Sequence, residues 1–202
     1  MKLDILAFGA HPDDIELGCS GTIIKHLKNG LKIGIIDLTR GELGTRGTVN
    51  TRNQETINST KVLGVQLRES MDFKDGLFEN NEKNKIELIK KIREYRPEIV
   101  LTNAPTDRHP DHGRSSELTI DACFLAGLEK IETGQDVWRP KYIYHYIQFN
   151  TILPDFVVDI TEEMDKKLES ILCYKTQFYN PDSKESETII SSEDFLESVK
   201  YR

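Results

Sequence analysis

Apolar and polar positions in the first thirty residues follow two different periods. A predominantly apolar run over residues 3–10 is typical of a short strand buried on both faces. A helical stripe follows it and ends at the turn pair Asn29-Gly30; the stripe consists of Ile15, Leu17, Ile23, Ile24 and Leu27. The chain is therefore expected to open with a strand, a short connection and a helix.

This succession recurs along the chain. Strand patterns fall at residues 32–38, 66–73, 98–103, 141–149 and 156–160, and helical patterns at 51–63, 80–95, about 114–128 and from 161 onward. Strand, helix, strand units within one sheet are parallel and right-handed. We therefore expect one α/β domain over residues 1–202, a Rossmann-like three-layer sandwich with helices on both faces of a mostly parallel sheet.

Two of the expected strands end in clusters of histidine and carboxylate. The first leads into His11-Pro12-Asp13-Asp14, and the strand at 98–103 leads into the segment Asp-Arg-His-Pro-Asp-His-Gly at 107–113. Three of the five histidines lie in these segments, at the sheet edge where α/β proteins bind ligands. Two His and one Asp are enough protein ligands for a catalytic zinc. The pattern favours a metal site; two unrelated surface loops, with Asp13 or Asp14 as a helix cap, are the alternative.

The polar segment at 39–50, with three evenly spaced glycines, predicts a flexible binding loop. It lacks a phosphate-binding glycine fingerprint, and so does the turn after the first strand, which disfavours a nucleotide-binding Rossmann protein. The cations available in and just after this segment are Arg46 and Arg52. His145 lies within an aromatic strand pattern, where a packed histidine is more common than a metal ligand.

Composition narrows the class of protein further. The net charge of −7 argues against non-specific nucleic-acid binding, which needs a basic face. No apolar run approaches the roughly 20 residues of a membrane span, and no signal-peptide pattern is present, so we expect a cytoplasmic protein without a membrane partner. Three widely spaced cysteines are expected to be buried reduced thiols: Cys19, Cys123 and Cys173.

The paired motifs Ala10-His11-Pro12-Asp13-Asp14 and His109-Pro110-Asp111-His112 resemble those of the LmbE-like, or PIG-L-like, zinc-dependent N-acetylglucosaminyl deacetylases. The segment Gly41–Thr48, an Arg-x-x-Glu pattern at Arg52 and Glu55, and Tyr174–Phe178 are similar to the bacillithiol-biosynthesis branch of that family. The resemblance runs from residue 1 to the end. It weakens at the C-terminus, where members of this branch usually continue into a further helix and a Tyr-rich tail.

Residue roles follow from the resemblance. It implies that His11, Asp14 and His112 hold zinc, while Fe²⁺, Mn²⁺ or Co²⁺ remain alternatives because they accept the same donors. Asp13 is then left free beside the metal, and we expect it to act as the general base.

The second motif and the glycine-rich region supply the remaining expected residues. We expect His109 to stabilise the oxyanion or protonate the leaving amine. Asp111 is expected to orient His109, with a helix cap as the alternative interpretation. The expected substrate-binding residues are Arg52, Asp75 and Arg46. Glu55, the second residue of the Arg-x-x-Glu pattern, could simply be a helix partner of Arg52 three residues away.

The resemblance implies a hydrolase that removes the acetyl group from an N-acetylglucosamine-containing substrate, with N-acetylglucosaminyl malate as the favoured one. Another N-acetylated sugar, such as a chitooligosaccharide, is the alternative substrate, and an inactive metal-binding or sugar-binding module is the alternative function. The short C-terminus predicts a pocket open on one side. Either the sequence is incomplete there, or the site closes differently, for example against a neighbouring subunit of a homo-oligomer.

Overall fold

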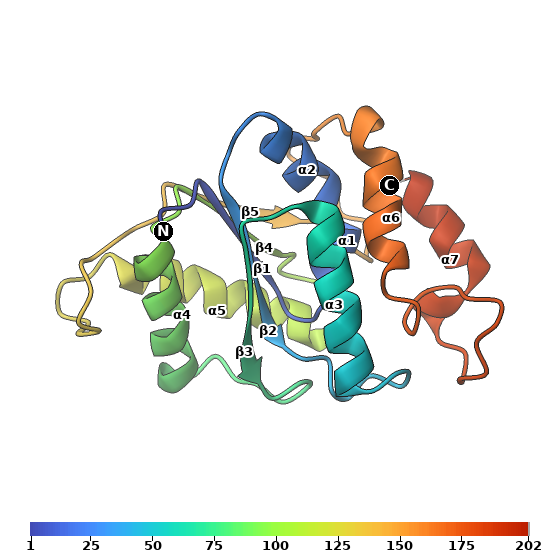
Figure 1. Ribbon diagram of the computed structural model, residues 1–202. Helices are drawn as coiled ribbons and strands as arrows, with labels where there is room; N and C mark the ends of the chain where they lie inside the picture. The colour runs from blue at the N-terminus through green and yellow to red at the C-terminus, as the bar shows by residue number, and fades with distance from the viewer. Residues whose placement is uncertain (202) are drawn as a thin grey trace.

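A computed structural model of the protein describes residues 1–201. Its strands form one parallel sheet in the order β3-β2-β1-β4-β5 (Figure 1). They are β1 (Ile5–Gly9), β2 (Ile33–Thr39), β3 (Leu67–Phe73), β4 (Ile99–Asn103) and β5 (Tyr142–Tyr146). The α/β fold expected from the alternating pattern is confirmed.

The two strands β1 and β2 are buried at every position, because each has a strand on both sides and helices above and below. In the register of the sheet, Ile5 lies between Ile33 of β2 and Ile99 of β4. The strand order reverses here, since the chain moves from β1 to β2 on one side while β4 lies on the other. Loops leaving β1 and β4 therefore diverge, and the crevice between such loops is where open α/β sheets bind ligands.

Helices cover both faces of the sheet (Figure 1). On one face lie α4 (Glu82–Tyr95) and α5 (Pro110–Ala126); on the other lie α1 (Asp14–Gly18), α2 (Ser20–Lys28) and α3 (Val49–Leu63). α6 (Met164–Leu172) packs against α2 and α3, and α7 (Glu193–Ser198) lies beside it. Three short 3₁₀ helices are η1 (Thr161–Glu163), η2 (Ile189–Ser191) and η3 (Val199–Tyr201).

Side chains of β1 alternate between two hydrophobic cores. Leu6 and Phe8 point into the core formed with α4 and α5, whereas Ile5 and Ala7 point into the core formed with α1, α2 and α3. A third cluster, centred on Tyr174 and Phe178, joins α6 to α7. None of the helices within residues 1–201 is long and apolar enough to cross a membrane.

One element boundary matters for the site. The sequence pattern predicted a helix from about residue 114, but α5 begins at Pro110 and so contains His112 in its first turn. Proline at the first helical position has its backbone angle preset for the helix, and the Nδ1 atom of His109 caps the helix by accepting the N–H of Asp111. The second histidine motif is therefore held by a helix terminus rather than by a loop.

Two expectations for local structure were wrong. Residues 156–160 form no strand; Ile160 packs on Gly21, and the backbone oxygen of Asp159 accepts a hydrogen bond from Lys25 Nζ at 2.5 Å. The single helix expected before Asn29 is broken at Cys19, whose φ of −142° is not helical. Of the three cysteines, Cys173 is only partly buried.

Candidate metal centre and active site

A cavity of about 490 Å³ lies at the ends of β1 and β4. Its floor comes from the His11–Asp14 segment and from the first turn of α5, and its walls come from the glycine-rich loop after β2, from residues 148–149 and from residues 188–195. All three histidines of the two motifs line it. The fold therefore brings together the two clusters that lie about a hundred residues apart in the sequence.

Asp14 lies between two of these histidines. Its Oδ1 atom is 3.2 Å from His112 Nε2, and its Oδ2 atom is 3.6 Å from His11 Nδ1. In a tetrahedral site with bonds of about 2.0–2.2 Å, two ligand atoms lie about 3.4 Å apart. The two distances between Asp14 and the histidines are close to that separation, each through a different carboxylate oxygen.

Carboxylates contact the ring nitrogens that face away from Asp14. Asp107 Oδ2 lies 2.7 Å from His112 Nδ1, while Asp111 Oδ2 and Asp75 Oδ1 lie 3.2 and 3.1 Å from His11 Nε2. Carboxylates in such positions fix the tautomer and orientation of metal-binding histidines. The nitrogens left to bind a cation are His112 Nε2 and His11 Nδ1.

Within residues 1–201, two groups of side chains offer ligand atoms that all lie within 4.8 Å of one another: His11 with His109 and His112, and His11 with Asp75 and Asp111. Atoms in both groups have other partners, as do both oxygens of Asp14. His109 Nδ1 accepts the N–H of Asp111, and Asp111 Oδ2 accepts the N–H of Gly76. We keep His11, Asp14 and His112 as the candidate donor set, because the resemblance of the two motifs implies it and Asp14 contacts both imidazoles.

The electrostatics of the donor set are dominated by its carboxylates. Burial lowers the pKa of both histidines, but Asp111 and Asp14 hold the pKa of His11 well above its usual value, and Asp14 and Asp107 raise that of His112 to about 9. Burial raises the pKa of Asp14, yet the two imidazoles outweigh it and hold that pKa well below its usual value. A bound cation needs neutral imidazoles, so its uptake would release protons from this site.

Asp13 lines the same cavity but has a different environment. Burial raises its pKa to about 7, although the charge of Arg52 opposes the shift. Arg52 Nη2 lies 3.1 Å from Asp13 Oδ2 and donates a second hydrogen bond to the backbone oxygen of Pro12. The φ of Asp13 is 101°, in the left-handed region that residues other than glycine rarely adopt. Strain of this kind is concentrated at functional sites.

His109 is half-buried at the cavity wall, with its ring centroid 4.5 Å from that of His11. Burial and the neighbouring imidazoles lower the pKa of His109, which favours a neutral ring over an imidazolium. Because Nδ1 accepts the N–H of Asp111, the proton of the neutral ring lies on Nε2. His109 can thus donate one hydrogen bond from Nε2.

Asp111 is not placed as expected. Its carboxylate contacts His11 rather than His109, and its Oδ1 atom accepts a hydrogen bond from Arg114 Nη1 at 2.5 Å. The residue that caps α5 is His109. The expectation failed because the pattern gave the order of these residues along the chain but not the side of the helix terminus that each one faces.

The three expected substrate-binding residues differ in position. Asp75 and Arg52 line the cavity, and Asp75 Oδ2 accepts the N–H of Leu43 in the glycine-rich loop. Arg46 is buried outside the cavity lining, where its Nη2 donates to Ser183 Oγ at 2.5 Å. Its guanidinium therefore fastens the C-terminal part of the chain to the glycine-rich loop.

Two sequence motifs from distant parts of the chain meet near this loop. Glu55 accepts hydrogen bonds from the backbone N–H and the hydroxyl of Thr176, at 2.7 and 2.8 Å. Gln177 Nε2 donates to the backbone oxygen of Arg46 at 2.9 Å. Glu55 therefore has its hydrogen-bond partner in the C-terminal region. The Arg-x-x-Glu spacing does not have to be explained by a helix contact between Arg52 and Glu55.

Sequence reasoning missed three polar contacts to the donor set. Asn103 Nδ2 donates to Asp14 Oδ2 at 3.0 Å, and Gln148 Nε2 donates to Asp14 Oδ1 at 2.6 Å. The third is Asp107 on His112. Asn103 could have been found as a polar residue that ends a buried strand, whereas no local pattern marks Gln148.

His145, which we expected to be packed, does not line the cavity. Its Nδ1 atom lies 2.8 Å from the backbone oxygen of Asn103.

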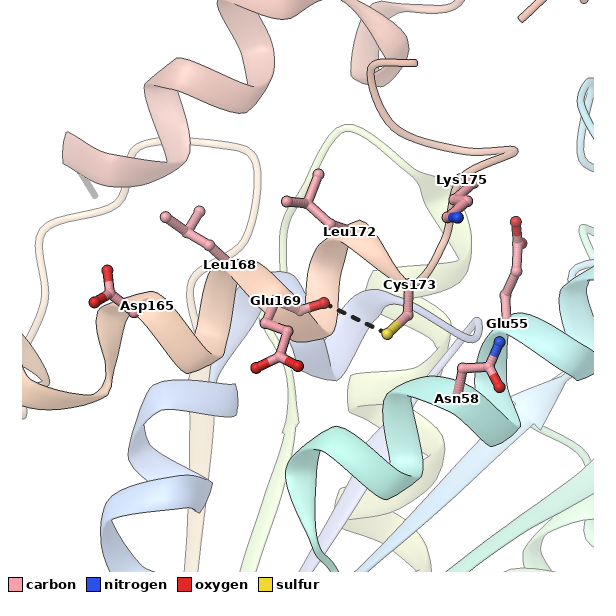
Figure 2. A pocket seen from close by; sticks show the side chains of 8 residues that line it. All are labelled: Glu55, Asn58, Asp165, Leu168, Glu169, Leu172, Cys173 and Lys175. Carbon is pink, nitrogen blue, oxygen red and sulfur yellow. Dashed lines mark hydrogen bonds between the residues drawn. The ribbon is translucent and has the colours of Figure 1, made fainter. Parts of the chain in front are cut away.

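A second hollow, of about 590 Å³, lies between α3 and α6 (Figure 2). Its lining includes Leu168 and Leu172 of α6 and Asn58 of α3, and the Cys173 thiol there donates to the backbone oxygen of Glu169. No histidine is among the residues that line it. The histidines of both motifs line the cavity at the sheet edge instead.

Comparisons with known proteins agree with this site. The model of the family described as PIG-L, GlcNAc-PI de-N-acetylase, matches residues 6–123. The diacetylchitobiose deacetylase of Thermococcus kodakarensis is 31% identical over 186 residues, which cover 86% of this chain and 70% of that protein. A probable N-acetyl-alpha-D-glucosaminyl L-malate deacetylase 2 of Bacillus anthracis is 25% identical over 187 residues, covering 86% and 81% of the two chains.

Solved structures share the whole fold. A conserved protein from Thermus thermophilus superposes with a TM-score of 0.89 at 33% identity, over 98% of this chain and 86% of that one. The N,N'-diacetylchitobiose deacetylase from Pyrococcus horikoshii superposes with a TM-score of 0.81 at 25% identity, over 98% and 74%. The family model covers more than half of the chain, and it includes both histidine motifs. The chain therefore belongs to the PIG-L, or LmbE-like, family of metal-dependent deacetylases.

Proposed function

We propose that this protein is a zinc-dependent hydrolase that removes the acetyl group from a small N-acetylglucosamine-containing oligosaccharide of the chitooligosaccharide class. The observation that carries the proposal is the cavity itself. It holds a donor set of His11, Asp14 and His112 and, beside it, a buried carboxylate, Asp13, that is not part of the set. A module that only binds a metal or a sugar has no need of this additional carboxylate.

The choice of substrate rests on the relatives. The bacillithiol-like motifs favoured N-acetylglucosaminyl malate, but the relative named for that substrate is 25% identical, whereas the relative named for diacetylchitobiose is 31% identical. A solved structure with the same named substrate also aligns over 98% of this chain. We therefore favour N,N'-diacetylchitobiose over the malate conjugate.

The donor set favours zinc among the available cations. Two imidazoles and one carboxylate leave a fourth tetrahedral position open, as catalytic zinc sites do. Fe²⁺, Mn²⁺ and Co²⁺ accept the same donors and compete through geometry and availability. When bound, the cation supplies a Lewis acid that polarises the acetyl carbonyl and makes water more acidic.

The residues of the chain supply the proton transfers. Asp13 accepts the proton of the attacking water, and its pKa of about 7 places it near the working pH of a general base. Arg52 keeps the Asp13 carboxylate oriented through the 3.1 Å contact. His109, neutral with its proton on Nε2, donates a hydrogen bond to the oxygen that becomes negative in the transition state. Asp13 then returns this proton to the nitrogen of the amide as the C–N bond breaks, so the products are acetate and the free amine.

The test is an acetate-release assay with metal analysis. We expect one zinc per chain, loss of activity on chelation with recovery on adding zinc, and faster turnover of N,N'-diacetylchitobiose than of N-acetylglucosaminyl malate. His112→Ala removes one member of the proposed donor set and should therefore lose both metal and activity. Bound metal without acetate release from any N-acetylated sugar would contradict the proposal and favour the inactive binding module. A preference for the malate conjugate would reverse the choice of substrate.

A further inference from the structure

We propose that Asp107 is the positioning residue for His112, and that it selects Nε2 of that imidazole as the atom that binds the metal; the proposal rests on the metal site proposed above. Asp107 Oδ2 lies 2.7 Å from His112 Nδ1, and the Asp107 side chain is only 1% exposed. Asp107 is neither a member of the donor set nor a residue that lines the cavity. Its contact with the site passes through His112.

The argument begins with the two nitrogens of the imidazole. A neutral ring carries its proton on one nitrogen, and only the other has a lone pair for a metal. A carboxylate on Nδ1 favours the proton there, because Nδ1–H can donate to it. Nε2 is then the free donor, and this atom lies 3.2 Å from Asp14 Oδ1. Without the carboxylate, neither the tautomer of His112 nor the orientation of its ring would be fixed.

Asp107 is itself held in place. Its Oδ1 atom accepts the backbone N–H groups of Arg108 and Asn150, each at 2.8 Å, which leaves Oδ2 for His112. Two backbone donors on Oδ1 therefore hold the carboxylate independently of His112. A residue held this firmly can transmit its orientation to the ring of His112.

The same carboxylate connects the donor set to the segment after β5. Asn150 belongs to the segment that also carries Gln148, whose Nε2 donates to Asp14 Oδ1. Asp107 contacts one member of the donor set, and Gln148 contacts another. We infer that this arrangement fixes His112 and Asp14 relative to each other before a cation binds, which lowers the entropy lost on binding.

The experiment compares zinc affinity in five proteins: the wild type, Asp107→Asn, Asp107→Ala, His112→Ala and Asp155→Asn. Affinity is measured by competition with a chromophoric chelator, starting from metal-free protein. We expect Asp107→Asn, which keeps the shape of the side chain, to weaken zinc binding by roughly 10- to 100-fold, as loss of a partner to a metal-binding histidine does. Asp155 is exposed on the neighbouring segment, so Asp155→Asn should match the wild type.

Two further measurements separate positioning from folding. Thermal denaturation of the metal-free proteins identifies any variant that is not folded, and Asp107→Asn remains informative if Asp107→Ala is not. In ¹⁵N spectra of the zinc-loaded wild type, His112 Nδ1 should carry a proton that exchanges slowly with water. In Asp107→Asn the signal of this proton should be lost.

The outcomes distinguish this inference from the function proposed above. If the wild type binds zinc, His112→Ala does not, and folded Asp107→Asn binds as tightly as the wild type, the role of Asp107 is overturned while the metal site stands. If the wild type itself binds no zinc, the proposed metal site falls and the inference falls with it.

Discussion

At the scale of single residues, Asp13 and Asp14 are neighbours with opposite properties. Burial raises the pKa of Asp13 to about 7, whereas the pKa of Asp14 is held well below its usual value because two imidazoles outweigh the effect of burial. The left-handed backbone at Asp13, with φ of 101°, lets the two carboxylates of one dipeptide occupy different environments. One is suited to accept a proton, and the other to remain charged beside a cation.

This contrast predicts the effect of Asp13→Asn. The amide keeps the size of the side chain and tolerates left-handed backbone, but it cannot accept the proton of water. We expect turnover to fall by roughly two to four orders of magnitude. Zinc content, measured on the same preparation, should remain that of the wild type.

The control for this prediction is Asp155→Asn, which changes an exposed carboxylate and should retain full activity. If Asp13→Asn lost its metal together with its activity, Asp13 rather than Asp14 would belong to the donor set.

At the scale of elements, a buried polar network lies beneath the candidate site. Arg68 of β3 pairs with Asp37 of β2 through two hydrogen bonds, at 2.7 and 3.0 Å, and with Glu16 of α1 at 2.6 Å. Ser59 of α3 and Tyr174 donate to the same Glu16 oxygen. The network therefore ties together the sheet, two helices and the C-terminal region, and one of these helices is α1, which begins at Asp14.

Arg68→Leu should destabilise the protein strongly. The substitution leaves two buried carboxylates without their cation, and breaking a buried ion pair in this way costs about 3–5 kcal/mol. The free energy of unfolding, from urea denaturation, measures the effect. Arg40→Ala is the control, because Arg40 and its partner Asp72 are more than half exposed and such a pair contributes at most about 1 kcal/mol.

The same variant has a predictable pH dependence. Burial already raises the pKa of Asp37 in the wild type against the opposing charge of Arg68, and without Arg68 the folded-state pKa should rise further. A carboxyl whose folded pKa lies above its unfolded value favours the folded state at low pH and loses that advantage as the pH rises. The deficit of Arg68→Leu should therefore be smaller in acid than at neutral pH. An equal deficit at both would show that lost packing, not uncompensated charge, is responsible.

At the scale of the whole molecule, the cavity combines parts from the entire length of the chain. The donor set comes from the ends of β1 and β4, and one wall comes from the C-terminal region through Ile189, Ile190 and Phe195. Phe195 packs on Phe149 with ring centroids 6.0 Å apart. The C-terminal region therefore shapes the cavity without supplying any member of the proposed donor set.

Ile189→Ala should separate substrate binding from chemistry. Ile189 lines the cavity but is 58% exposed, so its truncation should change the free energy of unfolding by no more than about 0.5 kcal/mol. We expect KM for N,N'-diacetylchitobiose to rise while kcat changes little, because uniform binding is lost. Leu153→Ala, at a residue 93% exposed outside the cavity lining, should leave both constants unchanged. A fall in kcat with KM unchanged would place Ile189 in the catalytic machinery instead.

Much of the fold could be predicted from periodicity, because strands and helices bury side chains with different repeats. The five strands of the sheet and the helices beside them follow that pattern. Residues 156–160 have equally strand-like composition and form no strand, since pairing depends on which sheet edge a segment reaches. The start of α5 was placed too late because Pro110 and the His109 cap act through geometry that an apolar stripe does not reveal.

The sequence by itself determined the chemical types at the site and their place at strand ends, because those features are local and short in range. It therefore favoured a metal site built from the two motifs, and the family resemblance implied His11, Asp14 and His112 as its ligands. Only the tertiary structure decided which partner each side chain has: Asp111 contacts His11, Asp107 contacts His112, and Arg46 lies outside the cavity lining. The physical reason is that hydrogen bonds act over about 3 Å, and the fold alone decides which atoms come that close.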